Sequence, residues 1–531
     1  MLSAKLKLLF TDIYFLITLV ICIAVYLFKY QDLFVPYFGD ELWAYGPAVR
    51  KMGQQIPSLL PNALSVEDHW GHPLLFFFLG GIWGTLFGTG IFSTHVFASL
   101  ISITFIIAFY LIIKRLFNSM MAFYSTLIVT TQSIFLGQFT LVLPEILLTL
   151  LMFITLYHYV MQQRAKYILF ASCLVLVKET GVLLIAAITI WDVLKTIVYE
   201  KENPIQWKHL KNWLLLSLPL VFLLFHMLLL KYFFGWFMVP ERVRAFDWEW
   251  DSYYRRIRRA FHYIFVNQGR RPVILVLFVI TTLFLKNYTW WKRLLLMALI
   301  FACYKIFFNY WKMPDWVVMT TIPLLFFYFI KIIFLDQYKE DKRKGSFVAA
   351  TSVFIVIYVL FSSSQFDSLR YLFCSIPFAV FLPVYFIRHN LKTLSNYLLP
   401  LFAAGCIFFS MSYMHTDTNF GDDTLNYREI SWAKQDAIRF LESNNYYAAS
   451  IRAPFLFSHA LTRPEAGYLS NMPFLHVNET NNTTDENSTR LLIIDRSENG
   501  HTNAMDKRGY EQIYQYQDRD IVWIEIYKHN K

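Results

Sequence analysis

Long apolar runs, separated by short polar connectors, dominate the chain from residue 8 to residue 412. A run of about 20 apolar residues matches the thickness of the hydrocarbon core of a bilayer when it forms a helix. The pattern therefore predicts about thirteen membrane-spanning helices. The predicted spans are 8–29, 92–114, 119–136, 139–161, 167–178, 181–198, 213–231, 272–286, 293–309, 316–335, 347–362, 370–388 and 395–412. Residues 167–198 have a second interpretation, one broken helix with an interfacial piece.

The pattern changes after residue 412, where apolar runs give way to Asn, Asp, Thr and Tyr. Residues 427–443 have the spacing of an amphipathic helix, and 491–495 and 521–527 resemble strands. We expect an all-α polytopic membrane domain over 1–412, followed by a small α/β domain over 413–531.

Composition and charge support insertion into a membrane. The 531 residues are 56% hydrophobic and only 16% charged, whereas soluble domains average about a quarter charged residues. The net charge of +11 lies mostly in short connectors and forms no single patch, which argues against nucleic-acid binding. The five cysteines lie in apolar segments without CxxC spacing, so we expect no disulfides and no metal ligands.

The basic connectors also predict a topology. Cytoplasmic connectors are enriched in Lys and Arg. With the N-terminus inside, every predicted inner connector is net basic, from Lys114 and Arg115 to Arg388 and Lys392. The outer stretches are then 30–91, 232–271 and everything after about residue 413.

The outer stretch 232–271 departs from this rule because it is rich in arginine. Within it, 252–265 has the spacing of an interfacial amphipathic helix. The arginines are Arg242, Arg244, Arg255, Arg256, Arg258, Arg259, Arg270 and Arg271. They fit two roles, anchoring to anionic headgroups or guiding a phosphorylated lipid to the protein.

Adjacent carboxylates follow the first span in the sequence GDELWAY, at Asp40 and Glu41. Asp40 could simply cap a helix. Two acids beside an apolar boundary are costly, however, and indicate a reactive role.

Other ionisable residues lie at predicted helix ends. His69 and His72 flank a turn, and Glu145 follows Pro144 one helical turn into the predicted span 139–161. Without a third histidine nearby, a turn role is the simpler reading of the histidine pair, and a zinc site is disfavoured.

Cationic residues break or begin three apolar segments. Lys178 and Glu179 interrupt two spans, where they could merely neutralise charge inside the bundle. Arg370 and Tyr371 begin a span at its outer end. This arginine could snorkel toward headgroups, or hold a phosphate through two parallel hydrogen bonds.

Taken in order, these motifs resemble the GT-C membrane glycosyltransferases, in particular the branch of dolichyl-phosphate-mannose-protein mannosyltransferases and lipid A aminoarabinose transferases. The likeness extends over about 30–200 and returns at 370. It rests on Asp40-Glu41 with Tyr45, His72-Pro73-Leu74-Leu75, FGTGIFSTHVFASL at 87–100, KRLF at 114–117, Glu145, Lys178-Glu179-Thr180-Gly181 and Arg370-Tyr371-Leu372. The chain departs from the family pattern in lacking a second proline after His72, in having Glu at 145, and in having Glu179.

The resemblance implies a GT-C fold and transfer of a sugar from a polyprenyl-phosphate donor, with inversion at the anomeric carbon. We expect Asp40 to act as the base and Glu41 to orient the acceptor or replace that base. Lys178 and Arg370 would stabilise the departing phosphate. The pocket would be completed by Tyr45, His72, Glu145, Glu179 and Tyr371.

No cofactor or metal is expected, although Asp40, Glu41 and Glu145 could bind a divalent ion if they converge. The partners would be the lipid donor, membrane lipids, and a protein, lipid or glycan acceptor. A bacterial inner membrane, with the site facing the periplasm, is the expected location.

Two other functions fit the sequence less well. A ligase or polymerase acting on lipid-pyrophosphate oligosaccharides differs only in its donor. A lipid-carrier flippase or transporter is disfavoured because the chain shows no internal repeat.

Overall fold

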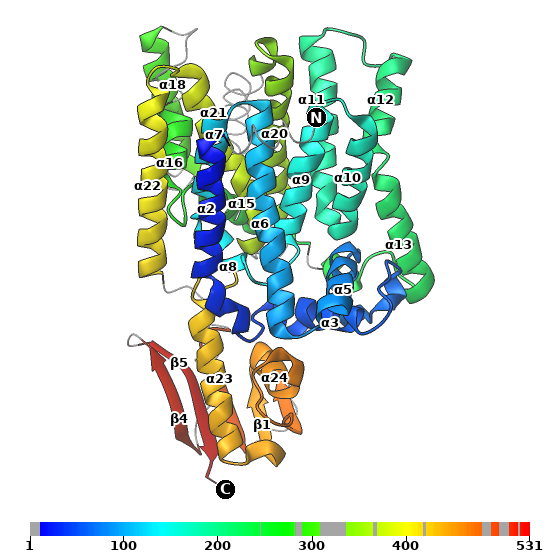
Figure 1. The fold of residues 1–531 in the computed structure, drawn as a ribbon, viewed down its shortest axis with the longest axis vertical. Helices are drawn as coiled ribbons and strands as arrows, with labels where there is room; N and C mark the ends of the chain where they lie inside the picture. Colours follow the sequence, from blue (N-terminus) through cyan, green and yellow to red (C-terminus); the bar gives the residue numbers. More distant parts are fainter. Residues whose placement is uncertain are drawn as a thin grey trace.

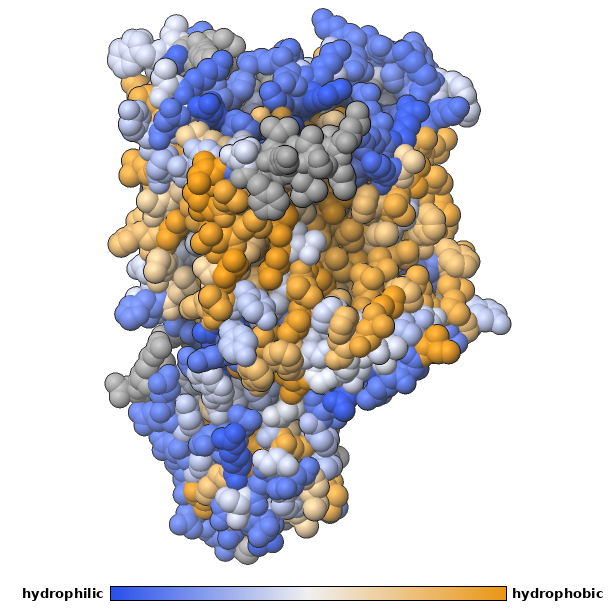
Figure 2. Space-filling view, viewed as in Figure 1, coloured by the Kyte–Doolittle hydropathy of each residue, from blue (hydrophilic) through white to orange (hydrophobic). Residues whose placement is uncertain are grey.

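The computed structural model of the protein consists of a bundle of helices with a small sheet domain at one end (Figure 1). The structure describes residues 11–244, 246–280, 282, 289–307, 336–364, 369–417, 421–479, 490–498, 509–518 and 521–530. On the face seen in Figure 2, an apolar band crosses the bundle between a hydrophilic cap and the mostly hydrophilic sheet domain. This distribution is that of a protein embedded in a membrane by its middle part.

The bundle contains long helices joined by short, tightly turned segments. Its first half consists of α2 (Ile13–Phe28), η1 (Tyr30–Phe34), η2 (Glu41–Tyr45), α3 (Gly46–Gly53), η3 (Pro61–Ala63), α4 (Val66–His69), α5 (Leu75–Phe87), α6 (Ile91–Leu116), α7 (Ser119–Thr130), α8 (Ser133–Gln138), α9 (Glu145–Val160), α10 (Arg164–Val177), η4 (Glu179–Gly181), α11 (Val182–Leu194) and η5 (Lys195–Tyr199). The second half consists of α12 (Trp207–Ser217), α13 (Leu220–Phe234), α14 (Pro240–Arg244), α15 (Trp250–Phe265), α16 (Arg271–Ile274), η6 (Leu275–Ile280), α18 (Trp290–Phe307), η8 (Asp336–Lys339), α20 (Lys342–Ser362), η9 (Leu369–Ser375), α21 (Ile376–Asn390) and α22 (Ser395–Thr416).

Among the described residues, five helices are long and apolar enough to cross a membrane, or six if the bent pair α12 and α13 is one span. Four of the predicted spans or outer segments form shorter apolar helices, α2, α5, α7 and α9. The predicted span 316–335 lies outside the described residues. The number of about thirteen spans therefore stays a prediction, while the mostly helical membrane fold is confirmed.

Two uncertain segments of the sequence have a definite structure. Residues 164–199 are divided at Lys178, whose extended backbone (φ −157°, ψ 139°) separates α10 from η4 and α11. The arginine-rich stretch forms α15 as predicted, and α15 packs against α20 and η9.

The C-terminal domain is α/β, as the sequence predicts. Helix α23 (Tyr427–Ser443) coincides with the predicted amphipathic helix and packs on β4 (Tyr510–Asp518) and β5 (Ile521–His529). The remaining elements are η10 (Tyr446–Ala448), β1 (Ser450–Ala453), α24 (Phe455–Thr462), η11 (Pro464–Ala466), β2 (His476–Glu479) and β3 (Leu491–Asp495). The sheet order is β2-β1-β3-β5-β4, with β1 parallel to β2 and β3, and β5 antiparallel to β3 and β4.

The first outer segment lies between the bundle and this sheet domain. The Tyr37 amide donates to the Ala466 carbonyl at 3.0 Å, and the Tyr468 hydroxyl donates to the Tyr37 carbonyl at 2.9 Å. Arg463 Nη1 donates to the Trp43 carbonyl at 2.9 Å. Contacts from the sheet domain thus hold the chain both before and after position 40, at Tyr37 and at Trp43.

Candidate active site

Asp40 stands where a sharp turn meets the irregular helix η2. Gly39 has φ +59°, in the left-handed region that glycine adopts readily, and this turn directs the chain into η2. The Asp40 side chain caps no backbone amide. Its Oδ1 accepts a hydrogen bond from Trp43 Nε1 at 2.9 Å, and its Oδ2 pairs with Arg370. The capping interpretation of Asp40 is therefore wrong, because its carboxylate faces a cation.

Arg370 connects three acidic groups from distant parts of the chain. It lies in η9 and is almost fully buried, with 1% of its side chain exposed. Its Nη2 pairs with Asp40, its Nη1 donates to Asp422 Oδ2 at 2.6 Å, and its Nε lies 3.8 Å from Glu145 Oε1. A buried guanidinium surrounded in this way is not snorkelling toward lipid headgroups.

Lys178 and Glu145 form a second ion pair in the same cluster. Glu145 begins α9, and its Oε1 accepts from Lys178 Nζ at 2.8 Å. Lys178 Nζ also lies 3.9 Å from the centre of the Tyr371 ring. The guanidinium carbon of Arg370 lies 4.8 Å from the same ring centre. The cluster thus places two cations side by side around one tyrosine.

His72 and Glu179 flank this cluster as a separate pair. His72 Nδ1 lies 2.9 Å from Glu179 Oε2, and the His72 ring stacks on Tyr45 at 6.1 Å. Tyr45 in turn lies 6.0 Å from the Arg370 guanidinium. Lys178 and Glu179 therefore have different partners, Glu145 for the lysine and His72 for the glutamate, so Lys178 does balance a charge within the bundle.

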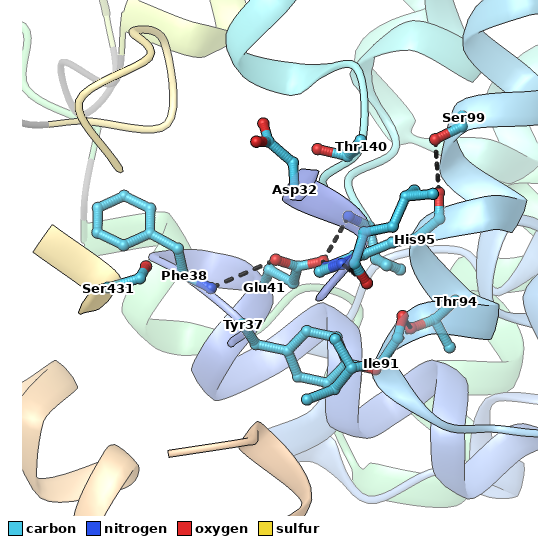
Figure 3. A network of polar contacts seen from close by, with 12 residues as sticks. Asp32, Tyr37, Phe38, Glu41, Ile91, Thr94, His95, Ser99, Thr140 and Ser431 are labelled. Carbon is cyan, nitrogen blue, oxygen red and sulfur yellow. Dashed lines mark hydrogen bonds and ion pairs between the residues drawn. The ribbon is translucent and has the colours of Figure 1, made fainter. Parts of the chain in front are cut away.

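Glu41 does not join the cluster, and the expectation that it orients the acceptor or replaces the base needs correction. Its buried carboxylate accepts hydrogen bonds from His95 Nε2 at 2.9 Å, the Val142 amide at 2.7 Å and the Phe38 amide at 3.3 Å (Figure 3). The side chain of the next residue in a helix points in another direction, so Asp40 and Glu41 face different surroundings. Glu41 joins η2 to α6 and to the segment before α9.

Asp422 is the site residue that the sequence analysis missed. It lies between α22 and α23, in the Gly-Asp-Asp sequence 421–423, far along the chain from the other motifs. A pair of adjacent acids after a glycine, between the last apolar run and the predicted helix 427–443, was the available signal, since it repeats the arrangement at positions 39–41.

Asp40 and Asp422, which pair with the two terminal nitrogens of Arg370, have pKa values shifted in opposite directions. Burial raises the pKa of Asp40, but Arg370 and the Trp43 hydrogen bond outweigh burial and hold that pKa below its ordinary 3.8. Burial raises the pKa of Asp422 to about 6, and Arg370 offsets only part of this shift. At neutral pH Asp40 is therefore firmly ionised, whereas Asp422 can take up a proton within a mildly acidic range.

Metal ligands do not converge at this cluster. Across the described residues there is no group of three or more His, Cys, Asp or Glu side chains arranged to hold a metal ion. Glu41 in particular is bound elsewhere, so the set Asp40, Glu41 and Glu145 does not form.

A family model and solved structures resemble this chain. Residues 71–229 match the model described as dolichyl-phosphate-mannose-protein mannosyltransferase, a range that includes His72, Glu145 and Lys178. The crystal structure of ArnT from Cupriavidus metallidurans bound to undecaprenyl phosphate is similar, with a TM-score of 0.51, 12% identity, and coverage of 97% of this chain and 98% of that one. An oligosaccharyltransferase from Archaeoglobus fulgidus, in complex with Zn and sulfate, has a TM-score of 0.48 and 13% identity, covering 97% of this chain and 72% of that one.

No curated protein sequence matches the chain significantly. At 12% identity, the likeness to ArnT concerns the fold. The likeness predicted from the ordered motifs is confirmed as a likeness: residues 71–229 match the dolichyl-phosphate-mannose-protein mannosyltransferase model, and the fold over nearly the whole chain is similar to that of ArnT.

Proposed function

We propose that this protein transfers a sugar from a polyprenyl-phosphate donor to an acceptor on the extracytoplasmic face of its membrane. One observation carries the proposal: Asp40, Glu145, Lys178 and Arg370, from four separate segments, meet in one charged cluster. The cluster combines a carboxylate that can accept a proton with two cations that can bind a phosphate, and this reaction requires both.

The reaction is a single displacement. The acceptor hydroxyl oxygen attacks the anomeric carbon while Asp40 takes the hydroxyl proton. The bond between the anomeric carbon and the phosphate oxygen breaks, and its electron pair leaves with the polyprenyl phosphate. Attack opposite the leaving group inverts the anomeric centre.

Lys178 and Arg370 stabilise the negative charge that grows on the departing phosphate. Both side chains are almost fully buried, at 6% and 1% exposure, and a buried cation interacts more strongly with developing charge than one in water. Glu145 keeps Lys178 in position. Tyr45, His72, Glu179 and Tyr371 form the surroundings of these groups.

Charge and architecture support a site on the extracytoplasmic side of the membrane. The cluster forms between the bundle and the first outer segment, next to the sheet domain, and the basic connectors of the predicted topology lie on the opposite side. With the N-terminus in the cytoplasm, the site faces the periplasm of a bacterial inner membrane. The shared fold with ArnT, whose structure holds undecaprenyl phosphate, supports a lipid-phosphate donor. The acceptor is a protein, a lipid or a glycan.

A direct test uses the purified full-length chain with labelled sugars on polyprenyl monophosphate and on polyprenyl pyrophosphate, together with a membrane extract as the acceptor source. We expect label to move from the monophosphate donor, with inverted configuration in the product. Movement from the pyrophosphate donor alone would favour a ligase, and lipid crossing without any covalent product would favour a flippase.

A further inference from the structure

The second carboxylate on Arg370 comes from the segment that links the bundle to the sheet domain. Asp422 Oδ2 accepts from Arg370 Nη1 at 2.6 Å, and Asp40 occupies Nη2. A Cβ atom built on Gly39 would lie 3.7 Å from Asp422 Oδ2, so the two acidic segments are in close contact. Both terminal nitrogens of this guanidinium are therefore engaged by carboxylates.

A phosphate binds arginine best through two parallel N–H donors, which are the groups that Asp40 and Asp422 hold. The charge balance also opposes a phosphate. When all five groups are ionised, Arg370 and Lys178 supply two positive charges, and Asp40, Glu145 and Asp422 supply three negative ones. An anionic ligand would then enter a cluster that is already net negative by one.

Asp422 is the carboxylate better suited to leave. Asp40 is also held by Trp43, and Glu145 is held by Lys178. Asp423, the residue after Asp422, is held by other groups. Its Oδ2 accepts hydrogen bonds from the Tyr263 hydroxyl at 2.8 Å and from Gln268 Nε2 at 3.1 Å. The segment can thus stay attached at Asp423, next to α15, while the Asp422 side chain turns away.

We infer that the Asp422 carboxylate and the phosphodiester of the lipid donor compete for Nη1 of Arg370 and exclude one another. Donor binding then requires Asp422 to release Arg370, by rotation or by taking up a proton. The inference rests on the proposed function for the identity of the phosphate. It makes Asp422 a positioning residue that sets the strength of donor binding.

The exchange has a predictable pH dependence. The charged groups that face Asp422 are Arg370, Asp40 and Asp423. Burial is the main cause that raises the pKa of Asp422 to about 6, and the two neighbouring acids add to it. A protonated Asp422 is neutral and holds Arg370 weakly, so phosphate binding becomes stronger as the pH falls through about 6.

The experiment measures binding of a polyprenyl methyl phosphodiester to the full-length protein in detergent. This probe carries one charge that is constant between about pH 5 and pH 8, unlike a phosphomonoester, whose second pKa is about 6. We expect wild type to bind the probe about tenfold more tightly at about pH 5 than at about pH 8. Asp422→Asn should bind tightly at both pH values. Dimethyl phosphate, as a competitor, measures how much of the effect belongs to the headgroup without the lipid.

Asp423→Asn is the matched control, because it removes the adjacent acid but leaves the Asp422 pair with Arg370. It should still bind the probe more tightly at low pH, with the transition moved to a somewhat lower pH, since Asp423 adds to the raised pKa of Asp422. Thermal unfolding of each variant verifies that it is folded. If folded Asp422→Asn binds the probe no more tightly than wild type at about pH 8, or keeps the same pH dependence, the inference is wrong. A failure of the proposed function looks different: the phosphodiester would bind with the expected pH dependence, yet no sugar would be transferred.

Discussion

At the scale of single residues, the environment of Asp40 sets its chemistry. The Trp43 indole N–H and the Arg370 guanidinium both stabilise its ionised form, and together they overcome the effect of burial on its pKa. About a third of the side chain, 34%, remains exposed, so an acceptor hydroxyl can reach it. Asp40 is therefore charged, oriented and accessible, as a general base must be.

The Trp43 hydrogen bond can be tested by Trp43→Phe, which keeps the aromatic ring and removes the N–H donor. A hydrogen bond to a charged group contributes about 1.5–3 kcal/mol, so we expect kcat to fall about tenfold or more. Because Trp43 orients the base, the KM for the donor should change little. An unchanged kcat, measured by transfer of labelled sugar, would show that Asp40 needs no such support.

Sequence reasoning found the residues of the cluster whose types are costly inside a membrane. Asp40, Glu145, Lys178 and Arg370 all interrupt or border apolar runs, and a membrane penalises such residues unless they are paired. It could not separate Asp40 from Glu41, because the irregular turns of η2 decide which way each side chain points. It missed Asp422 because that residue follows the last apolar run, where acids carry no penalty.

At the scale of elements, the site is assembled from helix ends. Glu145 begins α9, Lys178 separates α10 from η4, and Arg370 lies near the start of η9. Sequence patterns predicted the break at Lys178, but the predicted span 139–161 ran through Glu145, where α9 in fact begins after Pro144. The patterns could not predict that the breaks meet in space, because this depends on how distant helices pack.

A substitution at Glu41 distinguishes a structural role of this residue from a catalytic one. Its carboxylate ties η2 to His95 of α6 and to the Val142 amide, so Glu41→Gln weakens hydrogen bonds in a buried network. We expect the free energy of unfolding to fall by about 1–3 kcal/mol, while kcat of the folded protein stays within about threefold of wild type. Loss of kcat comparable to that of an Asp40 variant would return Glu41 to a catalytic role.

At the scale of the whole molecule, buried charges attach the sheet domain to the first helix. Asp32 pairs with Lys29 and with Arg428 Nε, and the Tyr427 hydroxyl also donates to it. Because Tyr427 and Arg428 begin α23, this network fixes the linking segment that carries Asp422. The sequence predicted the domain itself but not its attachment, which joins residues about 400 positions apart.

The attachment predicts the effect of Arg428→Leu. Removing Arg428 breaks one of the two ion pairs of Asp32 while Lys29 still compensates the Asp32 charge, so the loss is that of a charged hydrogen bond, about 1.5–3 kcal/mol. We expect a lower unfolding temperature and faster proteolysis between α22 and α23, with the helical bundle still intact. Proteolysis at the wild-type rate would mean that other contacts, such as those of Tyr37 with Ala466 and Tyr468, are sufficient to hold the domain.

The central claim is that Asp40 acts as the base in a transfer from polyprenyl phosphate, and its most direct test is the transfer rate of Asp40→Asn. Asp68→Asn is the matched control, because Asp68 is a buried acid of the same outer segment whose partner, Lys51 at 2.7 Å, lies outside the cluster. We expect folded Asp40→Asn to lose at least about a hundredfold in kcat, and Asp68→Asn to stay within about threefold of wild type. Undiminished transfer by folded Asp40→Asn would contradict the account.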